Sequence, residues 1–238
     1  MKIAAISDLH GHLSHSIPEC DVLVIAGDIV PLLSTAENWK QAQELHWWET
    51  KFVRWLRRNI RDSRARATFV VAGNHDILLN SHETREEARA VVEALPGVRV
   101  LGGQWCAVHA DFEGVRFAGY PYTPTIQQRT WAFSQARTSP AVPLALGQLP
   151  TNTDVLISHG PPQGILDTVD RGHVGCANLM KWMIDHGPAL TICGHVHERR
   201  GKRARYFDGR GVIRRIGNVS ICDENYSPKG AKVQVFEL

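Results

Sequence analysis

Two histidines separated by one residue, His195 and His197, follow a short apolar run at 189–192. Such a run predicts a buried strand, and two side chains just past its end can both point into one space. Neutral imidazole is a common metal ligand because it offers a lone pair without a net charge that must be desolvated. A histidine pair in a loop is more often a surface feature, so this pair alone is a weak signal for a metal site.

Four further stretches are built in the same way, each an apolar run followed at once by Asp, His or Asn beside a glycine. The runs lead into Ser7-Asp8-Leu9-His10-Gly11-His12, Ala26-Gly27-Asp28, Gly73-Asn74-His75-Asp76 and Ser158-His159-Gly160. In an α/β sheet, ligands gather at the carboxyl ends of the strands. Together the strand ends supply about seven oxygen and nitrogen ligands, which is more than one ion needs and about right for two.

In this order, the blocks resemble the signature motifs of the calcineurin-like metallophosphoesterase superfamily. The motifs are Asp8-x-His10, Gly27-Asp28, Gly73-Asn74-His75-Asp76, His159 and Gly194-His195-x-His197. Within that superfamily, the stretches at 119–124, 131–133, 159–167, 175–176 and 218–226 resemble the small class III-type phosphodiesterase branch that is related to the MPPED proteins. The resemblance implies a four-layer α/β/β/α sandwich, in which two mixed β-sheets are flanked by helices.

The resemblance also implies a centre of two divalent metal ions. It assigns Asp8, His10, Asp28 and His197 to the first ion, and Asp28, Asn74, His159 and His195 to the second, with Asp28 as the bridge. A mixed set of oxygen and nitrogen ligands without thiolate suits Mn²⁺, Fe²⁺/Fe³⁺ or Zn²⁺. Such ions lower the pKa of a bridging water, so that a hydroxide nucleophile exists at neutral pH.

Two residues beside the ligand Asn74 are candidates for catalysis. By resemblance, His75 orients the phosphate or protonates the leaving group. Asp76 could tune His75 by accepting a hydrogen bond from it, as carboxylates do for catalytic imidazoles. Capping of the next segment is an equally good interpretation of Asp76.

Length and composition bound the class of protein. A chain of 238 residues that is 43% hydrophobic and 21% charged predicts a single domain over 1–238. No run approaches the roughly 18 apolar residues of a membrane helix, and the first apolar run reads as a core strand rather than a signal peptide. Five scattered cysteines favour reduced thiols, so we expect a cytoplasmic protein. The net charge of +3 is too small to indicate nucleic acid or a membrane surface, and a homo-oligomer is left open.

The hydrophobic pattern predicts the elements that must position these residues. Strands are expected at 2–7, 21–26, 68–72, 98–101, 105–109, 115–118, 154–157, 189–192, 216–221 and 232–236. Helices are expected at 83–95 and 174–186, and from a capping box at Ser34 and Glu37 to about Ile60, where an aromatic stripe indicates core packing. We expect an irregular segment at 120–150 and a basic hairpin that turns at Asp208-Gly209.

These patterns favour a dinuclear metal-dependent phosphodiesterase that acts on a small-molecule phosphoester, with His75 assisting. A nuclease is the first alternative, in which the basic tract at 199–215 would track a phosphate backbone. A solvated hairpin face is the favoured interpretation of that tract, because no aromatic residues are interleaved as a stacking platform. A phosphomonoesterase could use the same core, and a non-catalytic scaffold would predict lost ligands, where none is missing.

Overall fold

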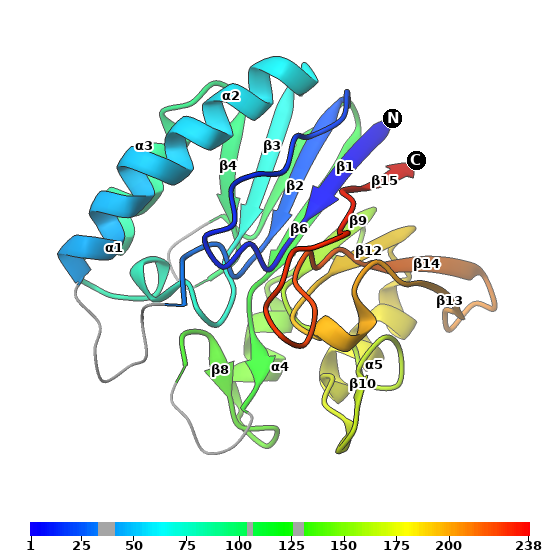
Figure 1. The fold of residues 1–238 in the computed structure, drawn as a ribbon. Helices are drawn as coiled ribbons and strands as arrows, with labels where there is room; N and C mark the ends of the chain where they lie inside the picture. Colours follow the sequence, from blue (N-terminus) through cyan, green and yellow to red (C-terminus); the bar gives the residue numbers. More distant parts are fainter. Residues whose placement is uncertain (33–40, 104–106, 126–130) are drawn as a thin grey trace.

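Two β-sheets lie face to face in the computed structural model, and helices cover their outer faces (Figure 1). The structure describes residues 1–32, 41–103, 107–125 and 131–238. Three separate apolar clusters fill the spaces between the layers. The predicted four-layer arrangement of two mixed sheets flanked by helices is therefore confirmed.

The first sheet has five strands in the order β15-β1-β2-β3-β4. Their bounds are Gln234–Glu237 for β15, Lys2–Ile6 for β1, Val22–Ala26 for β2, Ala67–Val71 for β3 and Val98–Leu101 for β4. Strands β1 to β4 are parallel, whereas β15 pairs antiparallel with β1 at the edge. The carboxyl ends of β1, β2 and β3 therefore lie along the same edge of this sheet.

The second sheet has six strands in the order β13-β14-β12-β9-β6-β5. Their bounds are Arg203–Phe207 for β13, Ile213–Asn218 for β14, Leu190–Cys193 for β12, Val155–Ser158 for β9, Val115–Tyr120 for β6 and His109–Phe112 for β5. The four inner strands are parallel and the two edge strands are antiparallel. Two small ladders stand apart, one of β7 (Thr123–Pro124) with β8 (Ser134–Gln135) and one of β10 (Thr168–Val169) with β11 (Gly172–His173).

Helices from different parts of the chain cover the outer faces of the two sheets (Figure 1). On the first sheet, α1 (Gln41–Trp47), a π-helical turn (Trp48–Phe52) and α2 (Val53–Ser63) follow one another, and α3 (Arg85–Glu93) lies beside them. On the second sheet lie α4 (Ala141–Gly147) and α5 (Ala177–His186). Two short 3₁₀ turns, Ile77–Leu79 and His197–Arg199, follow strands that lead into the site.

Alternate residues of the inner strands pack against different layers. In β2, Val22 and Val24 face the second sheet, whereas Leu23 and Ile25 face the helices. Because both faces of these parallel strands are covered, the strands are apolar throughout. This is why the sequence predicts them as continuous apolar runs. The aromatic stripe is core, as expected: Trp48 is fully buried, and its ring lies 4.4 Å from that of Phe52.

Several predicted elements differ from the structure. The strand expected at 105–109 begins outside the described residues, and the strand found there, β5, begins only at His109. Glu113 and Gly114 both adopt positive φ and form a tight hairpin turn that sets the register Phe112↔Val115. The segment expected to be irregular at 120–150 contains β7, β8 and α4. Helix α5 starts at Ala177, since the Sγ atom of Cys176 accepts the N–H of Leu179 and caps it. The capping box at Ser34 and Glu37 lies outside the described residues.

The basic hairpin also turns differently from the prediction. Its loop spans 208–212, because Oδ1 of the buried Asp208 accepts the main-chain N–H groups of Arg210 and Val212, both at 2.9 Å. The four cysteines of the described residues, Cys20, Cys176, Cys193 and Cys222, are buried and free, in keeping with the expectation of reduced thiols. Within the described ranges, the helices are too short or too polar to cross a membrane.

Candidate metal centre

The predicted ligands come from the carboxyl ends of five strands in both sheets. Asp8 and His10 follow β1, Asp28 follows β2, and Asn74 follows β3, whereas His159 follows β9 and the pair His195 and His197 follows β12. Main-chain hydrogen bonds join the strand ends. The Asp8 N–H donates to the carbonyl of Gly27 at 2.9 Å, and the Gly194 N–H donates to the carbonyl of His159 at 2.9 Å. The structure therefore brings all of the predicted ligands to one place between the sheets.

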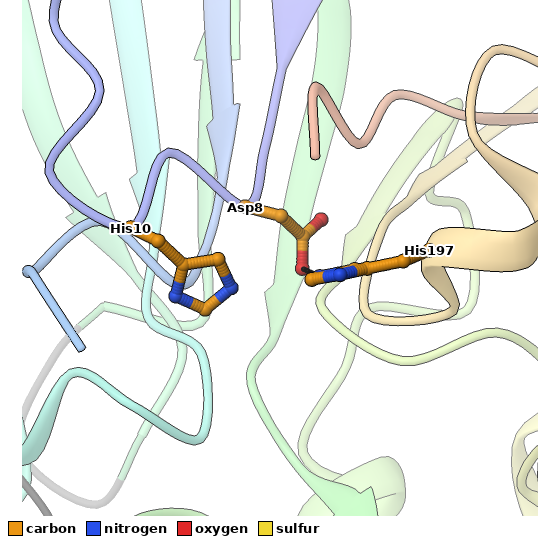
Figure 2. Close-up of side chains that lie close together, drawn as sticks. All are labelled: Asp8, His10 and His197. Carbon is orange, nitrogen blue, oxygen red and sulfur yellow. Dashed lines mark hydrogen bonds and ion pairs between the residues drawn. The ribbon is translucent and has the colours of Figure 1, made fainter. Parts of the chain in front are cut away.

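One group of ligand atoms belongs to Asp8, His10 and His197 (Figure 2). One ligand atom from each residue lies within 4.8 Å of the others. Nε2 of His197 is 3.3 Å from Oδ1 of Asp8, which is drawn as the dashed line in Figure 2. A carboxylate and two imidazoles at this spacing are a chemically suitable set for Mn²⁺, Fe or Zn²⁺.

A second group belongs to Asp28, His159 and His195. Nε2 of His159 lies 3.3 Å from Oδ2 of Asp28 and 3.1 Å from Oδ1 of Asn74. The same Oδ2 atom of Asp28 is 3.8 Å from Nε2 of His10, and Asp28 also forms a group with His10 and His75. Asp28 therefore lies between the two sets of ligands, as its predicted bridging role requires.

Hydrogen bonds behind the ligands fix which ring nitrogen faces the centre. The Nδ1–H of His159 donates to the carbonyl of Ala26 at 2.9 Å, and that of His197 donates to the carbonyl of Asp223 at 2.9 Å. Each bond turns Nε2 toward the carboxylates, which is the orientation in which metal-binding histidines are held. The Asp8 carboxylate is held in turn by the Ser7 hydroxyl at 2.5 Å and by the His195 N–H at 3.0 Å.

His10 provides a direct test of whether a metal fits. Both of its ring nitrogens are buried and have no hydrogen-bond partner among the described residues. A buried polar atom without a partner costs about 1–3 kcal/mol, so such atoms call for an explanation. A cation held by Nε2 would satisfy one of these nitrogens, and His10 lies where the predicted first ion would need it.

The site is electrostatically suited to cations. Burial raises the pKa values of Asp8 and Asp28, but the neighbouring imidazoles, with His197 at Asp8 and His159 at Asp28, outweigh burial and keep both carboxyls ionised. Burial alone would lower the pKa of His159, yet Asp28 outweighs burial and raises it to about 9. For His10, burial prevails and lowers the pKa to about 4, which leaves a neutral imidazole with a free lone pair.

The backbone at the ligands is strained. Asp8, His10, Asp28 and His195 adopt left-handed conformations, with φ of 54°, 41°, 54° and 67°. For residues other than glycine this conformation costs roughly 1–2 kcal/mol each, and it persists where the surrounding structure demands it. Such strain clusters at functional sites, because the chain there is shaped for ligand geometry rather than for its own stability.

Glycines beside the ligands leave room for them. A Cβ atom on Gly73 would overlap the carboxylate and main chain of Asp28, and one on Gly194 would overlap the Ser7 hydroxyl and the Asp8 carboxylate. The glycines of these two blocks are therefore required by the close approach of a ligand, which gives this part of the sequence pattern a physical cause.

Asp76 has a different environment from the one expected. Its carboxylate accepts three main-chain N–H groups, from Ile29 and Gly73 at 2.7 Å and from Val30 at 3.1 Å. No hydrogen bond joins Asp76 to His75 in the described part of the chain, and Nδ1 of His75 has no partner there. Burial, followed by the charge of Asp28, raises the pKa of Asp76 to about 7. Asp76 thus ties the loop after β2 to the loop after β3, and a catalytic role for it stays a prediction.

A cavity of about 420 Å³ opens onto the ligands. His75 lies on its wall, and the ring of Trp131 packs 4.5 Å from the ring of His75. The β10–β11 hairpin brings Asp170 and Arg171 to the rim, which Glu198, Glu224 and Tyr226 also line. Of these rim residues, only Glu224 and Tyr226 lie in a stretch that the family resemblance singled out, and the sequence assigned none of them a role.

The hairpin at the rim is anchored by a buried carboxylate. Asp167 is fully buried, and it accepts the Gly164 N–H at 2.9 Å and the Gly175 N–H at 3.1 Å. Its Oδ1 also accepts the Nδ1–H of His173 at 2.7 Å. Asp167 lies at the end of a stretch that the resemblance singled out, and its position shows that this stretch shapes the cavity.

Comparisons with known proteins place the chain in context. A family profile described as calcineurin-like phosphoesterase matches residues 1–199. Human metallophosphoesterase domain-containing protein 1 is 28% identical over 245 residues, which cover 95% of this chain and 68% of that protein. A UPF0046 protein of Caenorhabditis elegans is 29% identical over 210 residues, covering 84% of this chain and 65% of that protein.

Two further matches concern a longer protein and a solved structure. A protein of Emericella nidulans named probable rhamnogalacturonate lyase C is 28% identical over 213 residues, but they cover 87% of this chain and only 18% of that protein. The crystal structure of TT1561 from Thermus thermophilus superposes with a TM-score of 0.54 at 14% identity, covering 99% of this chain and 97% of that one. This likeness concerns the fold alone.

Proposed function

This chain belongs to the calcineurin-like phosphoesterase family, and we propose that it is a metal-dependent phosphoesterase that hydrolyses small-molecule phosphodiesters at a centre of two divalent ions. The matches to metallophosphoesterase domain-containing protein 1 and to UPF0046 proteins also confirm the predicted resemblance to that branch of the superfamily. The substrate class, the number of ions and the roles of Asp28 and His75 are parts of this proposal.

The position of Asp28 carries the proposal. Its carboxylate is grouped both with His10 and His75 and with His159 and His195. Its Oδ2 atom lies 3.8 Å from Nε2 of His10 and 3.3 Å from Nε2 of His159, two imidazoles assigned to different ions. A carboxylate shared in this way is the arrangement that screens the repulsion between two neighbouring cations.

The residues of the chain divide the work of hydrolysis. When bound, two divalent ions supply a hydroxide at neutral pH and neutralise charge on the phosphoryl group. His75 lines the cavity, and its Nδ1 atom has no hydrogen-bond partner among the described residues, so the ring can orient a phosphoryl oxygen or pass a proton to the leaving oxygen. Its main-chain N–H donates to Oδ1 of Asp28 at 2.8 Å, and Trp131 packs on its ring, so His75 is fixed relative to the ligands.

The charges at the rim support a diester rather than a monoester. A phosphomonoester carries nearly two negative charges at neutral pH, whereas a diester carries one. Among the described residues, the rim holds the exposed carboxylates of Asp170, Glu198 and Glu224 and one guanidinium, that of Arg171. Beyond the ions, the rim therefore disfavours the substrate with more negative charge.

The same rim, and the use of the basic tract, weigh against a nuclease. Arg203 bonds to Gln234 and to the carbonyl of Val235, Arg215 bonds to the carbonyl of Glu237, and Arg214 bonds to Asp208. Arg203 and Arg215 therefore join the second sheet to β15 of the first, and Arg214 is paired with a buried carboxylate. A polyanion would also have to pass the carboxylates at the mouth of the cavity, which is unfavourable.

The test is a panel of phosphate monoesters, small aryl and alkyl diesters and a short oligonucleotide, each assayed with Mn²⁺ and with a chelator. We expect Mn²⁺-dependent turnover that is faster for the small diesters than for the matched monoesters. Elemental analysis of the purified protein measures the ions per chain, with two expected. Faster turnover of monoesters, or of the oligonucleotide alone, would replace the proposed substrate class, and a content of one ion would remove the dinuclear mechanism.

A further inference from the structure

Tyr226 has an unusual backbone conformation beside the centre. Its φ is 58°, in the left-handed region, which is uncommon for a bulky aromatic residue and costs roughly 1–2 kcal/mol. Four of the predicted ligands share this conformation, and three of them, His10, Asp28 and His195, line the same cavity as Tyr226. Strain of this kind is evidence for a functional constraint when the surrounding structure holds it in place.

A dense set of hydrogen bonds holds the loop around Tyr226. Oδ1 of Asp223 accepts the N–H groups of Asn225 at 3.0 Å and Ser227 at 2.9 Å, and the Asp223 carbonyl accepts the Tyr226 N–H at 2.8 Å. From behind, Nη1 of Arg200 donates to the carbonyl of Ser227 at 3.1 Å. The loop is therefore built to keep Tyr226 in its strained conformation.

One atom links this loop to the metal ligands. The Asp223 carbonyl that accepts the Tyr226 N–H also accepts the Nδ1–H of His197 at 2.9 Å. The orientation of His197 and the position of Tyr226 are therefore set by the same peptide group. A substrate held by the ions would meet Tyr226 at a fixed distance from them.

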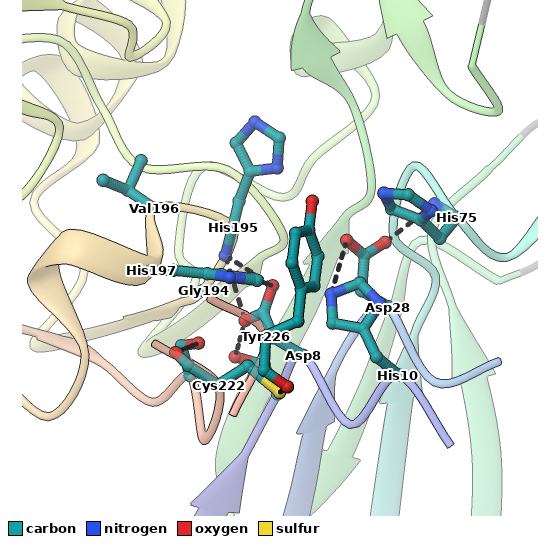
Figure 3. Close-up of polar contacts among 12 residues, drawn as sticks. Asp8, His10, Asp28, His75, Gly194, His195, Val196, His197, Cys222 and Tyr226 are labelled. Atoms are coloured by element: carbon teal, nitrogen blue, oxygen red, sulfur yellow. Dashed lines mark hydrogen bonds and ion pairs between the residues drawn. The ribbon is translucent and has the colours of Figure 1, made fainter. Parts of the chain in front are cut away.

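The side chain of Tyr226 projects over the centre. Its ring centroid lies 5.0 Å from that of His10 and 4.9 Å from that of His197, both at steep angles. Figure 3 shows the phenol rising from its loop between His197 and His10, with the hydroxyl directed away from the loop. The residue is 41% exposed and lines the cavity, and its hydroxyl makes no hydrogen bond to the other described residues.

The chemistry of the hydroxyl group matches this position. The phenol of a tyrosine can donate one hydrogen bond through its O–H group. A protonated hydroxyl that faces an anion-binding cavity without a partner is suited to donate to a phosphoryl oxygen.

We propose that Tyr226 contacts the substrate directly. Its hydroxyl donates a hydrogen bond to a phosphoryl oxygen of the ester, which lies at the metal site formed by Asp8, His10 and His197. The inference rests on the proposed function, since it places the phosphoryl group at the metal centre. It adds a residue outside the metal ligands and His75 to the binding of substrate. A purely structural Tyr226 would only pack its ring against the two histidines.

The experiment compares wild type with Tyr226→Phe, Tyr226→Ala and the control Tyr122→Phe. Tyr122 lies in a half-buried contact with Phe133, outside the cavity, so its change removes a tyrosine hydroxyl elsewhere. Three quantities are measured: Mn²⁺ content, the affinity of the Mn²⁺-loaded protein for inorganic phosphate by calorimetry, and kcat and KM for a small aryl phosphodiester.

For Tyr226→Phe we expect unchanged Mn²⁺ content, and a phosphate affinity and a kcat/KM that are each lower by about 10- to 100-fold, as for one lost hydrogen bond to a charged group. Tyr122→Phe should match wild type in all three. Equal phosphate affinity and kcat/KM in Tyr226→Phe and wild type would overturn the inference, as would losses seen only in Tyr226→Ala, which would assign the ring a packing role.

The two proposals fail in distinguishable ways. If wild type turns over no diester, the proposed substrate class fails, but the phosphate affinities of wild type and Tyr226→Phe still decide the role of the hydroxyl. If wild type binds neither Mn²⁺ nor phosphate, both proposals are wrong. If wild type turns over the diester and Tyr226→Phe equals it, only the role of Tyr226 is wrong.

Discussion

Nε2 of His159 lies 3.3 Å from Oδ2 of Asp28, although Asp28 follows a strand of the first sheet and His159 follows a strand of the second. The contact is fully buried on the His159 side, and the other ring nitrogen of His159 reaches back to the first sheet, at the carbonyl of Ala26. One imidazole of the second sheet is therefore held by two groups of the first. The centre depends on the stacking of the sheets as much as on its ligands.

Replacing Asp28 by Asn should remove at least one ion per chain and lower kcat/KM at least about 100-fold. The amide keeps the shape of the side chain but lacks the negative charge that a shared ligand needs, and even partners behind the ligands cost 10- to 100-fold when lost. Elemental analysis and diester hydrolysis measure the two effects. Asp111→Asn, on an exposed edge strand, is the control and should keep both ions. Full metal content in Asp28→Asn would contradict the bridging role.

Replacing His75 by Ala should lower kcat about 100- to 1,000-fold with metal content near that of wild type. His75 lies beside the ligands without being assigned to either ion, and a residue that orients phosphate or transfers a proton contributes about 10²–10⁴ in rate. His82→Ala, an exposed histidine near the same loop, should leave kcat unchanged. Unchanged turnover in His75→Ala would show that His75 has no catalytic role.

Two glycine substitutions should have opposite effects. Gly73→Ala places a methyl group against the Asp28 carboxylate, so we expect weaker Mn²⁺ binding and a free energy of unfolding lower by about 1–3 kcal/mol. Gly147→Ala, at the open end of α4, meets nothing and should raise that free energy by up to about 1 kcal/mol. Denaturant unfolding and Mn²⁺ titration measure the pair. If Gly73→Ala matches Gly147→Ala in Mn²⁺ binding and in free energy of unfolding, the loop after β3 moves freely away from Asp28.

Adding Mn²⁺ should raise the unfolding temperature, and a chelator should lower it. A ligand that binds only the folded chain stabilises it by about 2.7 kcal/mol at one hundred times its Kd, which corresponds to roughly 5–10 °C for a chain of this size. Scanning calorimetry with and without Mn²⁺ measures the shift, and Asp28→Asn should show a smaller one. A shift that is the same in both proteins would place the stabilising ion somewhere other than this centre.

Much of the fold could be predicted because parallel strands buried on both faces leave continuous apolar runs, as in β2 and β9. The position of the ligands followed from the same runs, since the polar residue after each run lies at the shared edge. The register of β5 could not be read, because it depends on the backbone of Glu113 and Gly114 rather than on a pattern.

Roles that depend on main-chain contacts also left no signal in the sequence. Asp76 binds three backbone N–H groups, and Asp223 orients His197 through its carbonyl, which any residue type provides. Tyr226 was within a recognised stretch, but its direction depends on a left-handed φ that residue types do not reveal. Such features become visible only when segments distant in sequence are placed together.

The meeting of Asp8 with His197, residues near opposite ends of the chain, has a consequence for how activity arises. A nascent or partly refolded chain with only the first sheet in place presents Asp8, His10 and Asp28 but none of the imidazoles of the second sheet, so it holds a cation weakly. Contacts between remote segments form late, because closing the intervening loop costs entropy before the contacts contribute favourable free energy. In a refolding experiment, the time at which hydrolysis recovers therefore measures when the two sheets finally dock. Chain collapse and secondary structure form earlier.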